Sequence, residues 1–350
     1  MSLGSLLALS EPTLSPGEEA TVCVAVATLW VSPDRVRPVD EPALGYQAKP
    51  RAWVNAMSPA ERDDLRGRVY TQLLLGERVR ILELRGDWAH VVALGQPSSL
   101  DGRGYPGWLP SYQLATVGSM FAAGIRVAQG GHRGRRGVAD DEEMEPEVDR
   151  SGMIHLVDAT ATTLRDEPDG ALVMPGVTFG TRLVASGRPH DGWLPVAVPG
   201  RFEPAWAVED DVTPEPAAPP ADPQEIVAMA DRLRDVPYIW GGASAYGVDC
   251  SGLVHLTWRR FGVTLPRDAA DQAAATTPVP LGSERPGDLY FFASAAGQID
   301  HVGFVAQTPD GDQRWVLHAS QPHGHVVLEE VAAERAATRR RPPRGLPLAS

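Results

Sequence analysis

Cysteine is almost absent from this sequence, with only Cys23 and Cys250 among 350 residues. Two cysteines cannot form the framework of several disulfides that is typical of small secreted proteins, and this usage fits a reducing compartment. A Cys23–Cys250 disulfide is the alternative. We expect free thiols instead, with Cys23 as a buried packing residue of the apolar run TVCVAVATLW.

Long apolar runs are missing as well. No stretch reaches the length of about 18 apolar residues that indicates a transmembrane helix. The opening MSLGSLLALSEPTLSP has a short apolar patch without a preceding basic residue, and acidic residues and prolines follow it. This pattern is not that of a secretory signal peptide, so we expect a cytoplasmic protein.

Positive charge and cofactor motifs are scarce. The net charge of −13 argues against nucleic acid or an anionic membrane as the main partner. The sequence contains no G-x-x-x-x-G-K-[ST], G-x-G-x-x-G, C-x-x-C or H-E-x-x-H motif. We therefore expect no cofactor and no metal, and a monomer.

Glycine and proline are plentiful, with 35 and 32 residues, which indicates many turns and much β structure. The chain divides by composition into several segments. We interpret them as a leader (1–18), a β domain with a helical insert at Pro50–Arg66 (19–117), a flexible insert (118–151), a second β domain (152–212), a proline-alanine linker (213–223) and a C-terminal domain (224–345).

The two β segments share one plan. The first contains GERV, GDW and GYPGWLP, and the second contains GTRL, DGW and PAWAV. The spacing from the first glycine to the first tryptophan is 12 residues in one copy and 13 in the other. We interpret them as two copies of a supersecondary unit. Two unrelated β domains with similar turns are the alternative.

The second cysteine has a reactive setting. The stretch PYIWGGASAYGVDCSGLV places Cys250 after a glycine-rich loop and at the start of an apolar run with helical spacing. A thiol at a helix N-terminus feels the positive end of the helix dipole, which lowers its pKa. We expect Cys250 to be a nucleophile with a lowered pKa.

Two histidines of the C-terminal domain suit the role of base and orienter. His301 lies in DHVGFVAQ and His318 in RWVLHAS, and the intervening TPDGDQ indicates a hairpin turn. Both imidazoles then lie at the same end of adjacent strands, within hydrogen-bonding reach of each other. His301 would accept the thiol proton and His318 would orient it. A zinc site made of Cys250, His301, His318 and His323 is the alternative, and His255 and His325 are expected to be packing or surface residues.

These motifs in order, YIWGG…VDCSGLV, RPGDLYFF, DHVGFV and VLHAS, resemble the NlpC-type cysteine peptidases of the cell wall. The resemblance implies an α+β fold, with a papain-like cysteine peptidase domain preceded by two small SH3-like β-barrels. It implies a catalytic triad of Cys250, His301 and His318, with Tyr238 beside the nucleophile. The backbone N–H of Cys250 is an expected oxyanion donor.

The upstream motifs DEPALGY, GERV, GDW and GYPGWLP resemble a subgroup with two SH3-like domains before the peptidase. That resemblance implies a cytoplasmic enzyme that cuts free murein peptides between γ-D-glutamate and the diamino acid and requires a free N-terminal L-alanine. It also implies substrate contacts from Glu77, Tyr105, Asp249 and Ser251. Many relatives carry a hydroxyl residue after LPRD, where this chain has Ala269.

The sequence thus predicts a γ-D-glutamyl-L-diamino acid endopeptidase of murein peptide recycling. Two other classes of function stay open. One is a protein that binds wall peptides through its SH3-like domains and has an inactive peptidase domain. The other is a thiol amidase or acyltransferase acting on other amides, since one fold hosts several chemistries.

Overall fold

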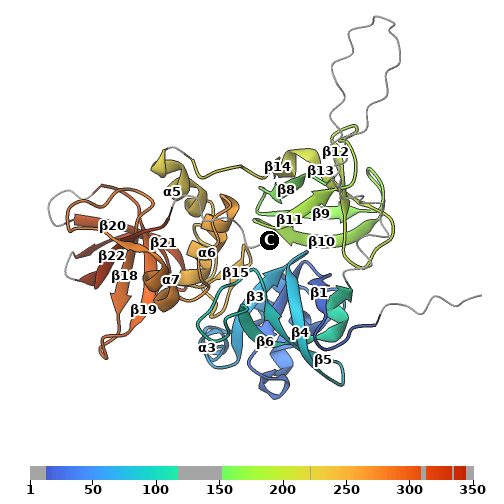
Figure 1. The fold of residues 1–350 in the computed structure, drawn as a ribbon, viewed down its shortest axis with the longest axis horizontal. Helices are drawn as coiled ribbons and strands as arrows, with labels where there is room; N and C mark the ends of the chain where they lie inside the picture. Colours follow the sequence, from blue (N-terminus) through green and yellow to red (C-terminus); the bar gives the residue numbers. More distant parts are fainter. Residues whose placement is uncertain (1–12, 117–151, 221, 309–312, 333–334, 344–350) are drawn as a thin grey trace, which may run out of the picture.

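The computed structural model describes residues 13–116, 152–220, 222–308, 313–332 and 335–343 (Figure 1). The predicted flexible insert 118–151 lies outside the described residues, and so do most of the predicted leader and the centre of the TPDGDQ turn. Two β domains lie side by side, and helices α5, α6 and α7 separate them from a C-terminal sheet (Figure 1). The order of helices and then an antiparallel sheet is the predicted α+β arrangement of the C-terminal domain.

The first β domain is a seven-stranded antiparallel sheet with the order β3-β2-β6-β5-β4-β1-β7. Its strands are β1 (Glu19–Val22), β2 (Val26–Trp30), β3 (Val69–Leu74), β4 (Arg78–Arg85), β5 (Trp88–Ala93), β6 (Tyr105–Pro110) and β7 (Leu114–Thr116). Cys23 lies in the break between β1 and β2, half-buried, with its thiol 3.7 Å from the Tyr112 carbonyl oxygen. It is therefore less buried than the sequence predicts, because the apolar run is two strands rather than one.

The helical insert of this domain consists of short helices. The predicted range Pro50–Arg66 holds α2 (Pro50–Ala56) and α3 (Pro59–Asp63), and α1 (Glu41–Leu44) precedes it. The Ser58 hydroxyl and the Glu61 carboxylate cap each other's backbone N–H groups in a capping box. This cap starts α3 within the insert.

The second β domain repeats the first. Its sheet has the order β10-β9-β13-β12-β11-β8-β14, which matches the first sheet strand for strand. The strands are β8 (Ile154–Val157), β9 (Ala161–Arg165), β10 (Leu172–Thr178), β11 (Arg182–Ala185), β12 (Trp193–Ala197), β13 (Ala205–Val208) and β14 (Val212–Pro214). The predicted repeat of one supersecondary plan is confirmed by this shared order.

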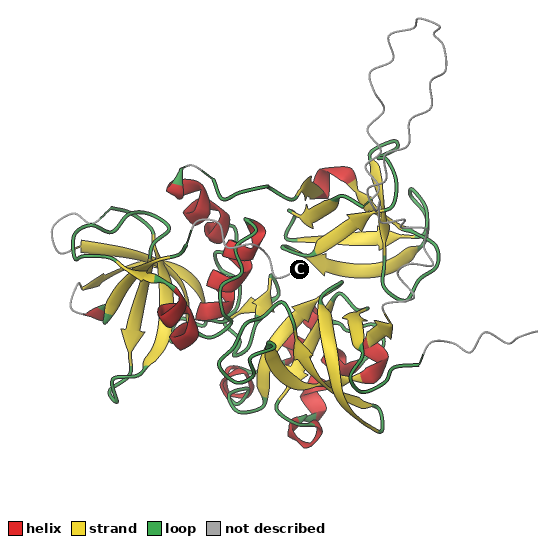
Figure 2. Ribbon diagram, in the orientation of Figure 1, coloured by secondary structure: helices red, strands yellow, loops and turns green. Residues whose placement is uncertain are grey.

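The C-terminal domain combines helices with a six-stranded antiparallel sheet of order β17-β22-β18-β19-β20-β21. Its helices are α5 (Pro223–Asp231), α6 (Cys250–Arg260) and α7 (Ala269–Ala275). The sheet contains β17 (Thr277–Pro278), β18 (Leu289–Ala293), β19 (Ile299–Val305), β20 (Gln313–Ser320), β21 (His325–Ala332) and β22 (Thr338–Arg341). Figure 2 shows that both β domains consist mainly of strands, and that α5, α6 and α7 lie between these domains and this sheet.

A small hairpin, β15 (Ala243–Ser244) with β16 (Gly247–Val248), joins the three parts just before α6. The side-chain oxygen of Gln72, on β3, accepts hydrogen bonds from the Ala243 N–H at 3.1 Å and the Ser244 hydroxyl at 3.0 Å. Thr178, on β10, accepts one from the Ala245 N–H at 3.0 Å. Both β domains therefore hold the loop that leads to Cys250.

The largest hydrophobic cluster also crosses the domain borders. It contains Trp53 of the helical insert, Phe179 of the second β domain, and Leu253 and Phe304 of the C-terminal domain. Each β domain has a smaller core of its own besides this shared one. Within the described ranges, no helix is long and apolar enough to cross a bilayer.

Candidate active site

Cys250 is the first residue of α6, as predicted, and a dense polar network fixes its position. Asp249 caps the helix by accepting a 2.6 Å hydrogen bond from the Gly252 N–H, and it accepts a second from the Gly241 N–H at 2.9 Å. Arg267, which is fully buried, donates to both Asp249 oxygens at 2.8 and 2.9 Å. Such a bidentate pair is rigid, so the N-terminus of α6 has a single geometry.

The thiol of Cys250 is buried, and its ionisation differs from the prediction. Burial raises the pKa of Cys250 to about 12, and the neighbouring charge of Asp249 adds to the shift. The N–H groups of Val302 and Ser251 lower this pKa, but by less than burial raises it. The expectation of a lowered pKa is therefore wrong for the free protein, because desolvation outweighs the helix terminus.

His301 and His318 lie on adjacent strands and touch, as predicted. His301 Nε2 is 2.6 Å from His318 Nδ1. The register pairs Phe304 with Leu317, and extending it by one residue sets Gly303 opposite His318. A Cβ at Gly303 would lie 2.8 Å from the His318 Cβ and 2.5 Å from a Val316 methyl group. Glycine at this position gives the imidazole of His318 room beside β19.

A carboxylate is hydrogen-bonded to the second ring nitrogen of His318. Glu329, on β21, accepts a hydrogen bond from His318 Nε2 with a distance of 2.8 Å. The register pairs Glu329 with Val316, two residues from His318, so Glu329 and His318 are diagonal neighbours on one face of the sheet. The result is a continuous row of His301, His318 and Glu329 across three strands.

Burial keeps both imidazoles neutral. It lowers the pKa of His301 to about 3, with a further contribution from His318. Burial also lowers the pKa of His318, although the Glu329 carboxylate opposes the shift. His301 has its Nε2 engaged by His318, which leaves Nδ1 as the nitrogen able to accept a proton. A neutral thiol and a neutral base of this kind favour proton transfer during nucleophilic attack rather than a preformed ion pair.

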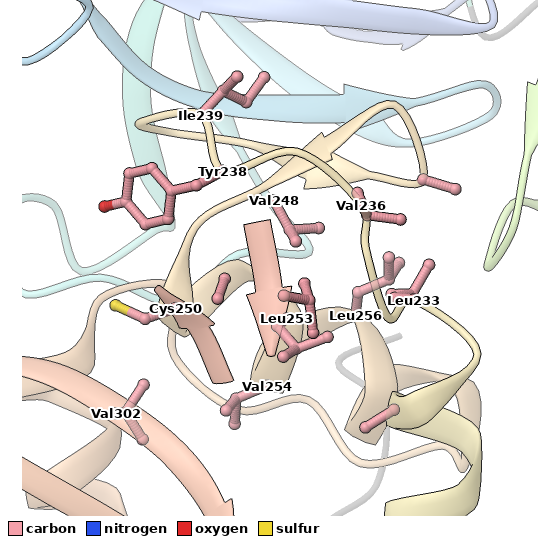
Figure 3. Close-up of a cluster of buried hydrophobic side chains, with 14 of the residues drawn as sticks. Leu233, Val236, Tyr238, Ile239, Val248, Cys250, Leu253, Val254, Leu256 and Val302 are labelled. Atoms are coloured by element: carbon pink, nitrogen blue, oxygen red, sulfur yellow. The ribbon is translucent and has the colours of Figure 1, made fainter. Parts of the chain in front are cut away.

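The thiol lies beside the strand of the base. The Val302 N–H, one residue after His301, reaches the Cys250 sulfur. In Figure 3 Cys250 lies between Tyr238 and Val302, and its sulfur points to the same side as the Tyr238 ring. The structure thus places Cys250 of α6 against β19, the strand of His301, and His301 in contact with His318 of β20.

Tyr238 lies near the nucleophile, as predicted. Burial raises the pKa of its phenol well above the usual range, and the charges of Cys250 and Asp249 add to the rise. Within the described residues, no hydrogen bond engages its hydroxyl. The group is therefore a free donor close to the sulfur, suited to an oxyanion or to a substrate carbonyl.

Two predicted substrate contacts, Asp249 and Ser251, belong to the polar network under the nucleophile. The Ser251 hydroxyl donates to Asp249 at 3.3 Å and accepts from Arg267 at 3.0 Å. Both residues are buried, and the negative charge of Asp249 is paired with the guanidinium of Arg267. The geometry gives both residues a role in holding the nucleophile, and their contact with a substrate stays a prediction.

Tyr105 reaches the same site from the first β domain. Its hydroxyl donates a 2.9 Å hydrogen bond to Asp268, the residue that precedes α7. Burial raises the pKa of Asp268, which the positive charge of Arg267 and the Tyr105 hydrogen bond only partly offset. One buried guanidinium here faces two carboxylates, those of Asp249 and Asp268. The cluster carries an excess negative charge that favours a cationic ligand.

Glu77 lies elsewhere. Its carboxylate forms an ion pair with Arg259 and accepts a 3.1 Å hydrogen bond from the Leu74 N–H. Arg259 is in the last turn of α6, about 13 Å along the helix from Cys250 at 1.5 Å per residue. The structure therefore does not bring Glu77 to the nucleophile. It gives this carboxylate an ionic contact between the first β domain and the C-terminal domain.

The zinc alternative conflicts with the histidine geometry. His301 and His318 direct ring nitrogens at each other, and the other nitrogen of His318 is bonded to Glu329. His323 is half-exposed and bonded to Ser320. In the described part of the chain, no cluster of three or more metal-ligating side chains occurs. His255 is a packing residue, as expected, fully buried with Nδ1 2.7 Å from the Leu265 carbonyl oxygen.

Sequence reasoning missed several residues of this site, including Arg267, Asp268 and Glu329. The motif LPRD contains the first two, but only Ala269 after it attracts attention by comparison with relatives. Ala269 is a buried residue in the first turn of α7. Glu329 lies in VVLEEV, where the alternation of a strand gives two candidate faces, and only the pairing register of β20 and β21 selects one.

Comparison with known proteins supports one family. The family model described as NlpC/P60 family matches residues 235–340, which hold every residue of the Cys250 site except Tyr105. A solved structure of an NlpC/P60 family protein from Bacillus cereus is similar to this one with a TM-score of 0.77 and 26% identity, over 93% of this chain and 99% of that one. The similarity includes the β domains as well as the C-terminal domain.

Two curated relatives extend over most of the chain. A protein from Bacillus cereus is 30% identical over 317 residues, covering 86% of this chain and 85% of the relative. One from Bacillus subtilis is 32% identical over 288 residues, covering 81% and 85%. Both are named gamma-D-glutamyl-L-lysine dipeptidyl-peptidase. A probable endopeptidase NlpC from Escherichia coli is 38% identical over 117 residues, covering 32% of this chain.

Proposed function

The chain belongs to the NlpC/P60 family of cysteine peptidases, and we propose that it releases L-Ala-γ-D-Glu from free murein peptides by hydrolysing the γ-D-glutamyl–diamino acid bond. The observation that carries this proposal is the buried Asp268 carboxyl, which Tyr105 bonds and which faces Arg267, the partner of Asp249 under Cys250. The names of the two long relatives support the same bond and a dipeptide product.

The reaction follows from the neutral thiol and the neutral base. As the Cys250 sulfur attacks the γ-carbonyl carbon, the thiol proton moves to His301 Nδ1 and the carbonyl oxygen becomes an oxyanion. The oxyanion accepts a hydrogen bond from the backbone N–H of Cys250 at the start of α6. The carbon–nitrogen bond then breaks, and Nδ1 returns its proton to the leaving amine. Water cleaves the resulting thioester, with His301 as the base a second time.

The free amine of L-alanine explains the acidic cluster. An ammonium group placed against Asp268 compensates the charge that Arg267 leaves unpaired, and Tyr105 fixes the orientation of the carboxylate. A peptide whose amine is blocked brings no positive charge and leaves the buried Asp268 with only Tyr105 and Arg267. We assign the ammonium to Asp268 and Tyr105 rather than to Glu77, which is paired with Arg259.

Cleavage of defined peptides tests this function. The enzyme should cleave L-Ala-γ-D-Glu-L-Lys, or its diaminopimelate counterpart, into the dipeptide and the diamino acid. The N-acetylated peptide should be cleaved about 10- to 150-fold more slowly, since a charged hydrogen bond contributes about 1.5–3 kcal/mol. Equal rates on both peptides would contradict the role of the ammonium.

Cys250→Ala separates the proposed peptidase from its alternatives. This variant should lose turnover and still bind the peptide in calorimetry. Turnover by the variant would refute the thiol mechanism, whereas binding without cleavage by the wild type would identify a binding protein. Cleavage of unrelated amides in preference to the γ-D-glutamyl bond would indicate an amidase or acyltransferase. Free murein peptides as substrates are consistent with the proposed cytoplasmic location and a monomeric enzyme.

A further inference from the structure

In the row of His301, His318 and Glu329, Glu329 is the one residue that does not belong to the predicted catalytic triad. It lies on β21, its side chain is 35% exposed, and its Oε1 is 2.8 Å from His318 Nε2. Its second oxygen is 3.9 Å from the half-exposed His323, too far for a hydrogen bond. The first contact, with His318, is therefore the one that engages the carboxylate.

A carboxylate can only accept hydrogen bonds, so this contact fixes the state of His318. The proton of neutral His318 must be on Nε2, where it is donated to Glu329. His318 Nδ1 is then an acceptor. Because Nδ1 is 2.6 Å from His301 Nε2, the proton of neutral His301 must be on Nε2. His301 Nδ1 is left without a proton, which is the state that a general base requires.

The opposite arrangement is inactive. A neutral His318 with its proton on Nδ1 would donate to His301 Nε2 and drive the proton of His301 onto Nδ1. That nitrogen could no longer accept the thiol proton. Burial lowers the pKa of both rings, so two neutral tautomers compete at each ring, and something must choose between them.

We propose that Glu329 is a positioning residue of the peptidase, which selects through His318 the tautomer of His301 that can accept the proton of Cys250. The charged groups around the pair are Glu329 on β21, His323 after β20 and Arg335 after β21. Apart from the bond between the two rings, only Glu329 forms a hydrogen bond to either catalytic ring in the described residues. The inference rests on the proposed thiol mechanism but not on the identity of the peptide.

Glu330 provides a matched control. It is the next residue on the same strand, exposed to solvent, and paired with Trp315 rather than with the row of histidines. Glu329→Ala and Glu330→Ala therefore remove the same charge from adjacent positions of β21. Only the first removes the acceptor for His318 Nε2. Glu329→Gln adds a variant of nearly the same size, whose amide oxygen can still accept that bond.

The first measurement is steady-state cleavage of L-Ala-γ-D-Glu-L-Lys. Glu329→Ala should lower kcat by about 10- to 100-fold with little change in KM, less than the ~10⁴-fold loss seen when a partner of the base itself is removed. Glu329→Gln should lie between Glu329→Ala and the wild type, and Glu330→Ala should match the wild type. Equal kcat for Glu329→Ala and Glu330→Ala would overturn the proposal.

The second measurement reads the tautomers directly and needs no substrate. Proton–nitrogen correlation spectra of protein labelled with nitrogen-15 in histidine, assigned with His301 and His318 variants, report which nitrogen carries the proton. Wild type should show Nε2–H at both rings, and Glu329→Ala should show a population with Nδ1–H. Unchanged tautomers in a folded Glu329→Ala protein would refute the inference. If the wild type fails to cleave the peptide, only the proposed substrate is contradicted, and the spectra still decide the role of Glu329.

Discussion

The Cys250 sulfur and the Asp268 carboxylate are two buried groups whose charge is set by what surrounds them. Burial and Asp249 raise the pKa of the thiol to about 12, and burial raises the pKa of Asp268. The thiol is therefore uncharged until a partner arrives, and burial disfavours the negative charge of Asp268 until it too gains a partner. For the thiol the partner is His301 in the transition state. For Asp268 it is the proposed substrate ammonium.

The raised pKa of Cys250 predicts the pH dependence of its alkylation. The thiolate is the form that reacts with iodoacetamide, and its fraction rises tenfold per pH unit below the pKa. In a Cys23→Ala background, we expect the alkylation rate of Cys250 to rise from pH 7 to 10 without a plateau, as mass spectrometry can follow. A plateau below pH 7 would instead indicate a thiolate–imidazolium pair.

Tyr105→Phe tests the acidic cluster. The loss of its hydroxyl should raise the pKa of Asp268 further, because the hydrogen bond from Tyr105 lowers that pKa. We expect kcat/KM to fall by about tenfold at pH 7.5, by analogy with other hydrogen bonds to charged groups, and to fall more at pH 5.5. Tyr112→Phe is the control, since the Tyr112 hydroxyl is bonded to the Leu44 carbonyl oxygen. An equal effect of both substitutions would contradict the assignment.

At the scale of elements, the active site is a junction of one helix terminus and three strands. Helix α6 presents the thiol, and β19, β20 and β21 each contribute one member of the row of His301, His318 and Glu329. The diagonal order of the row depends on the register of the strands. Shifting β20 by one residue would turn His318 to the opposite face of the sheet.

Gly303→Ala should damage this junction. The added methyl group would lie 2.8 Å from the His318 Cβ and 2.5 Å from a Val316 methyl group, so strand β20 must shift. Overpacking of this kind costs about 1–3 kcal/mol, and we expect a lower midpoint in urea unfolding together with a lower kcat. Gly95→Ala is the control, because a Cβ there meets open space. Wild-type kcat in Gly303→Ala would show that the close approach of β19 and β20 is not needed.

At the scale of the whole molecule, the three domains share one hydrophobic cluster, and burial lowers the pKa of two histidines. Trp53, Phe179 and Leu253 belong to different parts of the chain and pack in the same cluster. Within it, burial lowers the pKa of His255 to about 3, as it does for His301. Both histidines lie in the C-terminal domain, so acid acts on this domain's side of the shared interior.

The sign of the pH effect on stability follows from these lowered values. Between about pH 6.5 and 3 the unfolded chain binds a proton at His255 and the folded chain does not, so the free energy of unfolding falls as the pH falls. Each such histidine contributes up to about 1.4 kcal/mol per pH unit. Urea unfolding between pH 7.5 and 4.5 should show this loss.

His255→Asn should reduce that slope, since its amide can still donate to the Leu265 carbonyl oxygen without titrating. His190→Asn, at a side chain that is 71% exposed, should leave the slope unchanged. An unchanged slope in His255→Asn would mean that His255 is protonated in the folded protein.

Local patterns in the sequence predict much of this architecture. The spacing in SGLVHLTWRRFG predicts α6, and the paired motifs GERV and GTRL predict the repeat that both sheets show. Contacts between residues far apart in the sequence could not be predicted. The bond from Tyr105 to Asp268 joins residues 163 positions apart, and the choice of Glu329 over Glu330 needs a register. The raised pKa of Cys250 was missed because burial of a helix terminus is decided by the other domains.

The hairpin of β15 and β16 has a consequence for synthesis on the ribosome. Chains emerge N-terminus first and domains generally fold as units, so Gln72 and Thr178 are in place before Ala243, Ser244 and Ala245 leave the exit tunnel. The two β domains then act as a preformed template for the loop before Cys250. Arg267 emerges later still and completes the network around Asp249. The nascent chain therefore carries no assembled nucleophile until Arg267 has emerged.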